Sequence, residues 1–261
     1  MIKISIVTVS YNSACCIERT IQSVIAQTYK NKEYLIIDGS SNDNTLDIIN
    51  LYKSNIDIIV SEKDSGIYDA MNKAIDLATG DYILFLNADD VFADENVLED
   101  ISLAITDAEN NDVYYGNVVI QNAYGEYLKK PLPLDLITSK MVFSHQAVFI
   151  KKSVLEDNKF DLSYRYAADY NQLSSLYIKN YHFHYVDRVI AKVPVNSGAT
   201  YQNFRKSLNE HYAILEKRGM KIGLKKHKVI VLVTMVHWMK TLIPSRVLNP
   251  FLRWLSKYKT L

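Results

Sequence analysis

The sequence predicts an α/β protein with a Rossmann-like, mostly parallel central sheet and helices on both of its faces. One reason is that strand and helix patterns alternate through about the first 90 residues, which is typical of a parallel sheet. Another is the uninterrupted apolar run at residues 82–86, which is typical of a strand buried on both faces. This run ends in Asn87-Ala88-Asp89-Asp90, so an acidic tip is expected at the sheet edge where open α/β folds bind ligands.

The first half of the chain is expected to supply the parallel strands. Apolar and β-branched residues predict strands, and apolar residues at helical spacing predict the helices between them. Ser13 is expected to cap the first helix, and Gly80 is expected to end the third as its C′ residue. The expected strands are residues 3–9, 34–37, 56–60 and 82–86. The expected helices are the one after Ser13, which carries Ile17, Ile21, Val24 and Ile25, and those at residues 46–52 and 68–78.

The second half is expected to complete the fold around the acidic tip. Gly116 lies inside a strand pattern, which indicates a bulge or a close backbone approach. Gly125 and two prolines favour a surface loop over residues 122–133. The other expected elements are helices at residues 94–105 and 200–218 and strands at residues 113–120, 141–150 and 181–193.

The charges divide the chain into two parts of opposite sign. Residues 1–216 hold all 29 acids and 19 Lys and Arg, so their net charge is 19 − 29 = −10. Residues 217–261 hold the other 11 Lys and Arg and no acid, which gives +11. Such asymmetry indicates a basic tail that meets an anionic surface.

The basic tail contains apolar residues among its positive charges. Its apolar run at residues 229–239 is shorter than the roughly 20 residues that a spanning helix needs. Basic residues mixed with Trp and Leu favour amphipathic helices that lie in the headgroup plane of a membrane. Alternatively, these helices close the core of the protein or an oligomer interface. Nucleic-acid binding would also suit the charge, but no nucleic-acid motif is recognised.

Two further observations indicate the cellular compartment in which the protein is expected. Cys15 and Cys16 are neighbours and the chain has no other cysteine, so they form no disulfide framework and fit a reducing cytosol. The polar residues from Ser10 onwards follow a short apolar stretch, which does not fit a signal peptide. The expected location is therefore cytoplasmic, at the inner face of the cytoplasmic membrane.

Four blocks of the sequence carry a family resemblance. In order and spacing they resemble the successive signatures of family-2 glycosyltransferases with the GT-A fold, and together they cover residues 1 to about 100. Each block alone is a weak signal, whereas the four together are specific. The blocks are SIVTVSYN at 5–12, IDGSSNDNT at 37–45, DSGIYDAMNKA at 64–74 and NADD at 87–90.

The resemblance implies a site for a nucleotide sugar. Tyr11 and the backbone around Val9 would hold the base, and Asp38 would bond the base imide, which favours uracil. Asp64 would line the donor site, and Asn72 would lie beneath the ribose and diphosphate. The implied nucleotide-sugar-binding residues are Val9, Tyr11, Asp38, Asp64, Asn72, Ala88 and Asp89.

The acidic tip corresponds to the family's D-x-D motif, with Asn87 at its first position. The resemblance implies that Asp89, supported by Asp90, binds Mn²⁺ or Mg²⁺, because both ions prefer hard oxygen ligands. Such a cation would neutralise charge on the leaving diphosphate. Alternatively, Asp89, Asp90 and Asp94 only favour the start of the following helix.

Two further blocks resemble the acceptor side of the family. Ser144-His145-Gln146 matches a segment that faces the sugar pocket, so His145 and Gln146 would contact sugar; a buried structural histidine is the alternative. Asp169 stands where the family has an acidic pair, although Ala168 replaces the first acid. It would be the general base that takes the acceptor proton, or else a carboxylate that only favours the helix dipole.

These observations predict an enzyme, a metal-dependent hexosyltransferase. A glycosyltransferase domain over residues 1–220 would bind the nucleotide sugar with residues 1–100 and the acceptor with residues 101–220; residues 221–261 would meet the membrane. The expected reaction is inverting transfer from a UDP-sugar to a lipid-diphosphate-linked saccharide in bacterial surface-polysaccharide synthesis (O-antigen, capsule or exopolysaccharide). The protein is not expected to bind nucleic acid, and the prediction leaves open whether the protein forms an oligomer.

Two other classes compete with this prediction. A sugar-phosphate nucleotidyltransferase would want a glycine-rich phosphate loop after the first strand, where this chain has Ser10-Tyr11-Asn12-Ser13. A non-catalytic, membrane-tethered protein that binds nucleotide sugar or serves as a scaffold would need none of the acids at positions 38, 89 and 169.

Overall fold

The computed structural model describes residues 1–122, 125–194, 203–220 and 222. The chain divides into two compact units, Met1–Gln202 and Asn203–Leu261. Apart from residue 222, the basic helices expected at 221–261 lie outside the described residues, and the expected domain boundary at residue 220 stays a prediction. Within the described residues of the second unit, α8 spans Phe204–Lys217.

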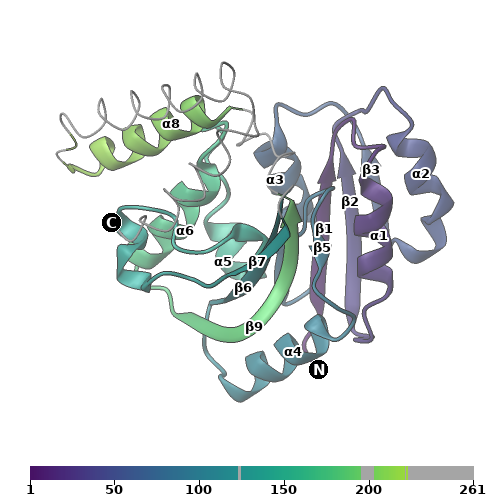
Figure 1. Cartoon of the computed structure of the whole chain (residues 1–261), viewed down its shortest axis with the longest axis horizontal. Helices are drawn as coiled ribbons and strands as arrows, with labels where there is room; N and C mark the ends of the chain where they lie inside the picture. Colours follow the sequence, from purple (N-terminus) through teal and green to yellow (C-terminus); the bar gives the residue numbers. More distant parts are fainter. Residues whose placement is uncertain (123–124, 195–202, 221, 223–261) are drawn as a thin grey trace. The chain divides into compact units, whose positions relative to one another are not determined.

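The first unit is built on one mixed sheet, which confirms the α/β class (Figure 1). Its order is β3-β2-β1-β4-β8-β6-β9-β5, and β7 pairs with β6 beside this path. β1 to β4 are parallel, whereas β8 runs antiparallel to both β4 and β6. The strands are β1 Ile4–Ser10, β2 Lys32–Asp38, β3 Ile58–Ser61, β4 Tyr82–Phe85, β5 Val91–Phe92, β6 Val113–Asn122, β7 Gly125–Lys129, β8 Val148–Lys151 and β9 Phe183–Pro194.

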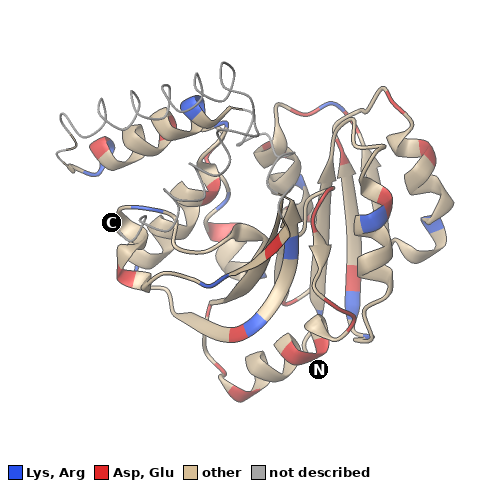
Figure 2. Cartoon of the chain, viewed as in Figure 1, with Lys and Arg blue, Asp and Glu red and all other residues tan. Residues whose placement is uncertain are grey.

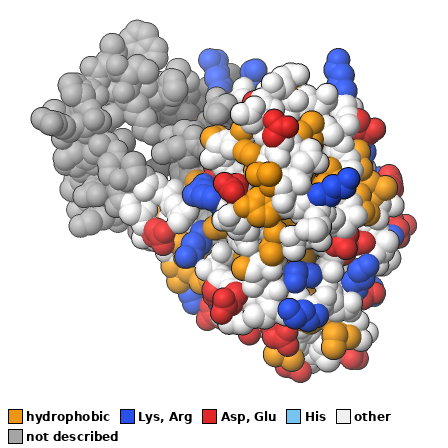
Figure 3. All heavy atoms as spheres, turned by 90° about the vertical axis from the view of Figure 1, so that its right-hand side faces the viewer, with side chains coloured by type: hydrophobic (Ala, Val, Ile, Leu, Met, Phe, Trp, Pro, Cys, Tyr) orange, Lys and Arg blue, Asp and Glu red, His pale blue; other side chains and the backbone are white. Residues whose placement is uncertain are grey.

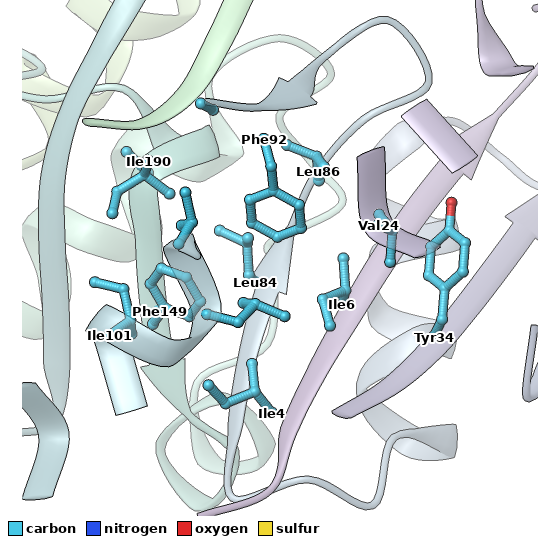
Figure 4. Packing of buried hydrophobic residues seen from close by; sticks show 14 of the residues in the cluster. Ile4, Ile6, Val24, Tyr34, Leu84, Leu86, Phe92, Ile101, Phe149 and Ile190 are labelled. Atoms are coloured by element: carbon cyan, nitrogen blue, oxygen red, sulfur yellow. The ribbon is translucent and has the colours of Figure 1, made fainter. Parts of the chain in front are cut away.

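Helices cover both faces of this sheet because its strands send alternate side chains to opposite sides. Ile4 and Ile6 of β1 enter the cluster under α1, α2 and α4, part of which Figure 4 shows. Val7 and Val9 enter the cluster under α3, α5 and α6. The helices are α1 Ile17–Ile25, α2 Thr45–Leu51, α3 Ile67–Leu77, α4 Val97–Asp107, α5 Lys152–Asp157 and α6 Ala168–Ile178, with 3-10 turns η1 Lys53–Asn55, η2 Leu134–Thr138 and η3 His145–Ala147.

Two helix ends differ from expectation. Cys16, not Ser13, is the N-cap residue of α1, because the Ser13 carbonyl closes a turn with the amides of Cys16 and Ile17. α3 ends at Leu77 and its C-cap residue, Ala78, is extended, so Gly80 is not the C′ residue of this helix. Gly80 is needed for space instead: a Cβ there would lie 2.5 Å from Ser5 Oγ and 2.9 Å from the Lys3 carbonyl oxygen.

We therefore expect Gly80→Ala to lower the free energy of unfolding by about 1–3 kcal/mol, because the added methyl group has no room beside β1. Chemical denaturation monitored by circular dichroism measures this. The double variant Ser5→Ala/Gly80→Ala should regain only part of the loss, since the Ser5 amide nitrogen would still lie 2.7 Å from the new Cβ. A single Gly80→Ala variant as stable as the wild type would contradict the close approach.

The second half of the sheet also departs from expectation in places. The segment expected as a loop over 122–133 contains β7, an exposed strand whose pairing with β6 the Gly and Pro signals did not reveal. The strand expected over 141–150 is shorter, because η3 precedes β8. The expected close approach at Gly116 is confirmed: a Cβ there would lie 2.7 Å from the Arg188 carbonyl oxygen, and the β6–β9 register shifts beside it.

The described surface mixes both signs of charge. Figure 2 shows acidic and basic residues on helices and strands around the sheet. On the face over α1 and α2, Figure 3 shows positive, negative and hydrophobic side chains interspersed, without a continuous patch of one sign. A membrane-spanning helix is not found among the described residues, where no helix is both long and apolar enough.

Candidate active site

The candidate site lies at the carboxyl ends of the parallel strands. Ser10 at the end of β1 pairs in register with Asp38 at the end of β2, which pairs with Ser61 at the end of β3. β4 runs parallel beside β1, so the tip that begins at Asn87 follows at the same edge. This pairing brings together the loops that the sequence predicts to carry the site.

Asp38 holds these loops in place. Its side chain is fully buried, and its carboxylate accepts hydrogen bonds from the hydroxyls of Ser10 (3.0 Å), Ser41 (2.5 Å) and Ser61 (2.9 Å) and from the Ser41 amide (2.9 Å). Four donors satisfy the oxygens of a buried side chain that would be costly to leave without hydrogen bonds. In this structure the carboxylate therefore organises the loops, while its contact with a base imide stays a prediction.

Tyr11, Gly39 and Asp64 form an open corner beside Asp38. The Tyr11 ring is exposed, with 60% of its surface accessible. A Cβ at Gly39 would lie 2.6 Å from Asp64 Oδ2 and 3.4 Å from the Tyr11 ring, so a glycine is needed here for the carboxylate to approach. Burial raises the pKa of Asp64. An exposed aromatic ring beside a carboxyl group can stack on a base and accept a hydrogen bond from it.

The acidic tip contains a carboxylate, that of Asp89, and a side-chain amide, that of Asn87. Arg19 of α1 contacts Asp89, with 2.7 Å between Nη2 and Oδ1. Asn87 Oδ1 is buried and has no hydrogen-bond partner. An unpaired amide oxygen two residues before a carboxylate that pairs with a guanidinium fits a hard cation. The described residues contain no group of three His, Cys, Asp or Glu that could hold a metal, so the substrate's own oxygens would have to complete such a site.

Asp90 differs from Asp89 although the two are adjacent. The carboxyl group of Asp90 is buried and hydrogen-bonded to Gln146. Burial raises the pKa of Asp90 to about 7, with a further contribution from the charge of Asp89. The backbone carbonyl of Asp90 accepts a hydrogen bond from the Thr20 hydroxyl at 2.8 Å. Asp90 therefore links the tip to the acceptor-side block, and its expected support of a metal stays a prediction.

A chain of polar contacts connects the tip to Asp169. Asn87 Nδ2 lies 3.1 Å from His145 Nε2, and His145 Nδ1 lies 3.4 Å from Asp169 Oδ2. The Tyr68 hydroxyl donates to Asp169 Oδ1 at 2.9 Å. Asp169 lies in the first turn of α6, and η3 carries His145. The structure thus joins two regions 82 residues apart in sequence into one site.

The charges of His145 and Asp169 stabilise each other. Burial acts to lower the pKa of His145, but the hydrogen bond and charge of Asp169 and the charge of Asp90 raise it above the ordinary value. Burial acts to raise the pKa of Asp169, but the hydrogen bond and charge of His145, with hydrogen bonds from the Tyr170 amide and Tyr68, lower it. Asp169 is therefore ionised at neutral pH.

We expect His145→Gln to lower the free energy of unfolding by about 1–2 kcal/mol near pH 5.5 and by less near pH 9. Because the pKa of His145 is raised in the folded protein, the charged imidazole stabilises the fold below about pH 6.5. This stabilisation is lost as the pH rises through the pKa that His145 has in the folded state. Because the pKa of Asp169 is lowered in the folded protein, its carboxylate stabilises the fold above about pH 3.8, and this stabilisation is lost on acidification. Denaturation at the two pH values measures the difference.

The control for this variant is His182→Gln, because His182 is exposed and also faces an aspartate, with Nδ1 3.4 Å from Asp112. This variant should change the free energy of unfolding little at either pH. Equal losses at pH 5.5 and pH 9 for His145→Gln would contradict the ion pair.

The remaining expected site residues have structural contacts. Asn72 Nδ2 donates to the Phe160 carbonyl at 2.9 Å, and Asn72 Oδ1 accepts from the Phe160 amide at 2.9 Å. Both ends of this amide are thus engaged with the backbone, and its place beneath a ribose stays a prediction. The side chains of Val9 and Ala88 are buried in the two core clusters.

A small cavity lies under Asp169 and His145. Its volume of about 20 Å³ is enough for about one water molecule. Its lining is mostly apolar, which shields the inner side of the ion pair from bulk water. The lining residues are Met71, Phe85, His145, Val148, Ile150, Phe160, Asp169, Gln172 and Leu173.

Sequence reasoning missed two residues of this site. Tyr68 lies in the DSGIYDAMNKA block, where the start of a helix was expected but no role for the hydroxyl. Arg19 is the one basic residue between positions 17 and 25, which was a usable signal beside an acidic tip. Neither contact could be derived without the packing of α1 and α3 against the sheet.

Comparison with known proteins gives a family match. The model of the family described as "Glycosyl transferase family 2" matches residues 5–169. A PGL/p-HBAD biosynthesis glycosyltransferase of Mycobacterium bovis is 33% identical over 171 residues. That match covers 64% of this chain and 66% of the relative, so it spans slightly less than two thirds of the relative's length.

Two solved structures share the fold. TarS 1-349 of S. aureus in complex with UDP-GlcNAc has a TM-score of 0.66 at 18% identity, covering 81% of this chain and 66% of that one. The mannosyltransferase PcManGT of Pyrobaculum calidifontis in complex with GDP-Man and Mn²⁺ has a TM-score of 0.66 at 16% identity, covering 99% and 81%. At these identities the likeness concerns the fold.

Proposed function

Because the chain belongs to glycosyl transferase family 2, we propose that it is an inverting, metal-dependent glycosyltransferase that moves a sugar from a UDP-sugar to a saccharide hydroxyl. The observation that carries this proposal is the contact chain Asn87–His145–Asp169. It places a carboxylate that can accept a proton in the same site as an acidic tip suited to a diphosphate and its cation.

The donor would bind at the corner of Tyr11, Gly39 and Asp64. The exposed Tyr11 ring can stack on the base, and Asp64, whose pKa burial raises, can take part in hydrogen bonding to it. The complexes of TarS with UDP-GlcNAc and of PcManGT with GDP-Man support a nucleotide sugar on this fold. Uracil is the proposed base, by the family resemblance at Asp38.

Asp89 and Asn87 Oδ1 would hold the cation, Mn²⁺ or Mg²⁺, together with oxygens of the donor diphosphate. The orphaned Asn87 oxygen and the attraction of Asp89 for positive charge support this assignment. When bound, the cation would neutralise charge on the departing diphosphate. The Mn²⁺ complex of PcManGT supports a divalent ion on this fold.

Asp169 would act as the general base. Its ionised carboxylate would take the proton of the acceptor hydroxyl while the hydroxyl oxygen attacks the anomeric carbon. The bond from that carbon to the diphosphate oxygen breaks at the same time, and the configuration inverts. Tyr68 and His145 contact the two oxygens of the carboxylate and would keep it oriented towards the acceptor.

The acceptor would be a saccharide on a lipid-diphosphate carrier, and the protein would work as a hexosyltransferase in bacterial surface-polysaccharide synthesis, including lipopolysaccharide. The net charge of +11 in residues 217–261 supports a position at the inner face of the cytoplasmic membrane. The M. bovis relative is a glycosyltransferase of PGL/p-HBAD biosynthesis, which supports a glycoconjugate acceptor.

A panel of UDP-, GDP- and dTDP-sugars, offered with Mn²⁺ and a synthetic lipid-diphosphate monosaccharide, tests the proposal. We expect one UDP-sugar to be consumed with release of UDP and formation of a disaccharide of inverted anomeric configuration. Turnover of a GDP- or dTDP-sugar alone would overturn the base assignment. Donor binding without any turnover would favour the non-catalytic scaffold.

A further inference from the structure

Arg19 pairs with Asp89, the carboxylate that the proposed function assigns to the cation. Its guanidinium contacts Asp89, with 2.7 Å between Nη2 and Oδ1. The Arg19 side chain is 59% exposed, whereas that of Asp89 is 23% exposed. A solvent-exposed positive side chain therefore pairs with the tip's more exposed carboxylate in the free protein.

The ion pair is not needed to hold α1 against the tip. The Thr20 hydroxyl donates to the Asp90 carbonyl at 2.8 Å, and the Phe92 amide donates to the Ser23 hydroxyl at 3.2 Å. Further along, Gln27 Nε2 donates to the Asp94 carbonyl at 2.6 Å. Exposed ion pairs contribute only about 0–1 kcal/mol to stability. The position of Arg19 is thus fixed by its neighbours, while its charged end stays free to change partner.

We propose that Arg19 is a donor-binding residue that exchanges partners: it pairs with Asp89 in the free protein and turns to the donor diphosphate when a divalent cation binds Asp89. This inference rests on the proposed function, because it takes the cation and the diphosphate from it. A guanidinium can bind phosphate oxygens with two parallel hydrogen bonds, and a cation on Asp89 would repel it towards them.

The exchange has a thermodynamic consequence. Without a donor, the cation must displace Arg19 from Asp89 and gains little. With a donor, the displaced Arg19 finds a new anionic partner at the same place, because the diphosphate must lie against the cation. Cation and nucleotide should therefore each raise the affinity of the other, and by linkage the two factors are equal.

Direct binding measurements separate the two roles of Arg19. Mn²⁺ affinity is measured by electron paramagnetic resonance without UDP, and UDP affinity by calorimetry with saturating Mn²⁺. We expect Arg19→Gln to bind Mn²⁺ alone about two- to fivefold more tightly, since an exposed ion pair no longer competes. The same variant should bind UDP with Mn²⁺ about tenfold more weakly, since a charge-assisted contact is lost.

Arg19→Lys and Lys152→Gln serve as matched variants. Arg19→Lys keeps the charge but not the bidentate geometry, so Mn²⁺ alone should bind as in the wild type while UDP binds more weakly. Lys152 pairs with Glu156 at 2.8 Å, and its amide donates to the Asp81 carbonyl at the opposite end of β4. Lys152→Gln should therefore leave both affinities unchanged.

The outcomes distinguish the inference from the function on which it rests. If wild-type protein binds UDP with Mn²⁺ but Arg19→Gln binds Mn²⁺ alone no more tightly, the exchange of partners is overturned and the donor site stands. If wild-type protein binds no UDP at any Mn²⁺ concentration, the donor site itself is overturned. Unchanged melting temperatures of the variants confirm that they fold.

Discussion

Asp169→Asn is expected to lower the rate of sugar transfer by roughly 10²–10⁴-fold, the usual contribution of a general base. The carboxylate is ionised at neutral pH, because His145, the Tyr170 amide and Tyr68 lower the pKa of Asp169 against the effect of burial. An amide of the same shape cannot take the acceptor proton. UDP affinity in the presence of Mn²⁺ should stay that of the wild type, because the tip at Asp89 is untouched.

Tyr68→Phe is the control for this prediction. It leaves the carboxylate in place but removes the hydroxyl that donates to Asp169 Oδ1 at 2.9 Å. That hydrogen bond lowers the pKa of Asp169, so its loss should raise the pKa and move the acid limb of the rate profile to higher pH. The rate at the optimum should fall far less than in Asp169→Asn.

Initial rates between pH 3 and pH 9, with the donor saturating, measure both variants, because the lowered pKa of Asp169 places the acid limb at the acidic end of this range. Transfer that survives Asp169→Asn within tenfold of the wild type would place the base elsewhere. An acid limb that stays unchanged in Tyr68→Phe would show that the hydroxyl does not act on the base.

Asp89→Ala is expected to weaken UDP binding in the presence of Mn²⁺ on the order of 10²- to 10³-fold and to abolish detectable transfer. A metal's stabilisation of phosphate charge is worth several kcal/mol, and the alanine removes its proposed carboxylate ligand. Asn87 Oδ1 would remain, but a single neutral oxygen holds a hard cation poorly. Calorimetric titration of UDP with and without Mn²⁺ measures the loss.

Asp76→Asn is the control for the loss of a negative charge. The Asp76 side chain is 58% exposed and pairs with Lys159 at 2.5 Å. It lies near the C-terminal end of α3, which is the end remote from the tip. This variant should bind UDP and transfer sugar as the wild type does. If Asp89→Ala still binds UDP in a Mn²⁺-dependent way with wild-type affinity, the acidic tip does not hold the cation.

The order of elements and the edge that carries the site could be predicted because they depend on local patterns. Alternating apolar faces separate the two core clusters, so Ile4 and Val7 already indicate helices on both sides of β1. Gly116 marked a close backbone approach that the structure confirms at the Arg188 carbonyl. Parallel pairing then brings the ends of β1, β2 and β3 together without further information.

Residue roles were harder to predict, because a side chain's role depends on what packs against it. Asp89 and Asp90 are adjacent and chemically identical, yet one pairs with an exposed arginine and the other is buried, with its pKa raised to about 7. β7 was expected as loop because Gly125 and the two prolines are turn signals, whereas in the structure Gly125–Lys129 pairs antiparallel with β6, the strand just before it in sequence.

By itself, the sequence determined the α/β class, the parallel first half of the sheet and the set of polar loops at its edge, since each follows from apolar spacing and turn residues over short stretches. The tertiary structure decided how these loops act together. η3 brings His145 between Asn87 and Asp169, and α1 brings Arg19 to Asp89. These contacts join residues 24 to 70 positions apart, and such distances are set by the packing of helices on the sheet rather than by local preference.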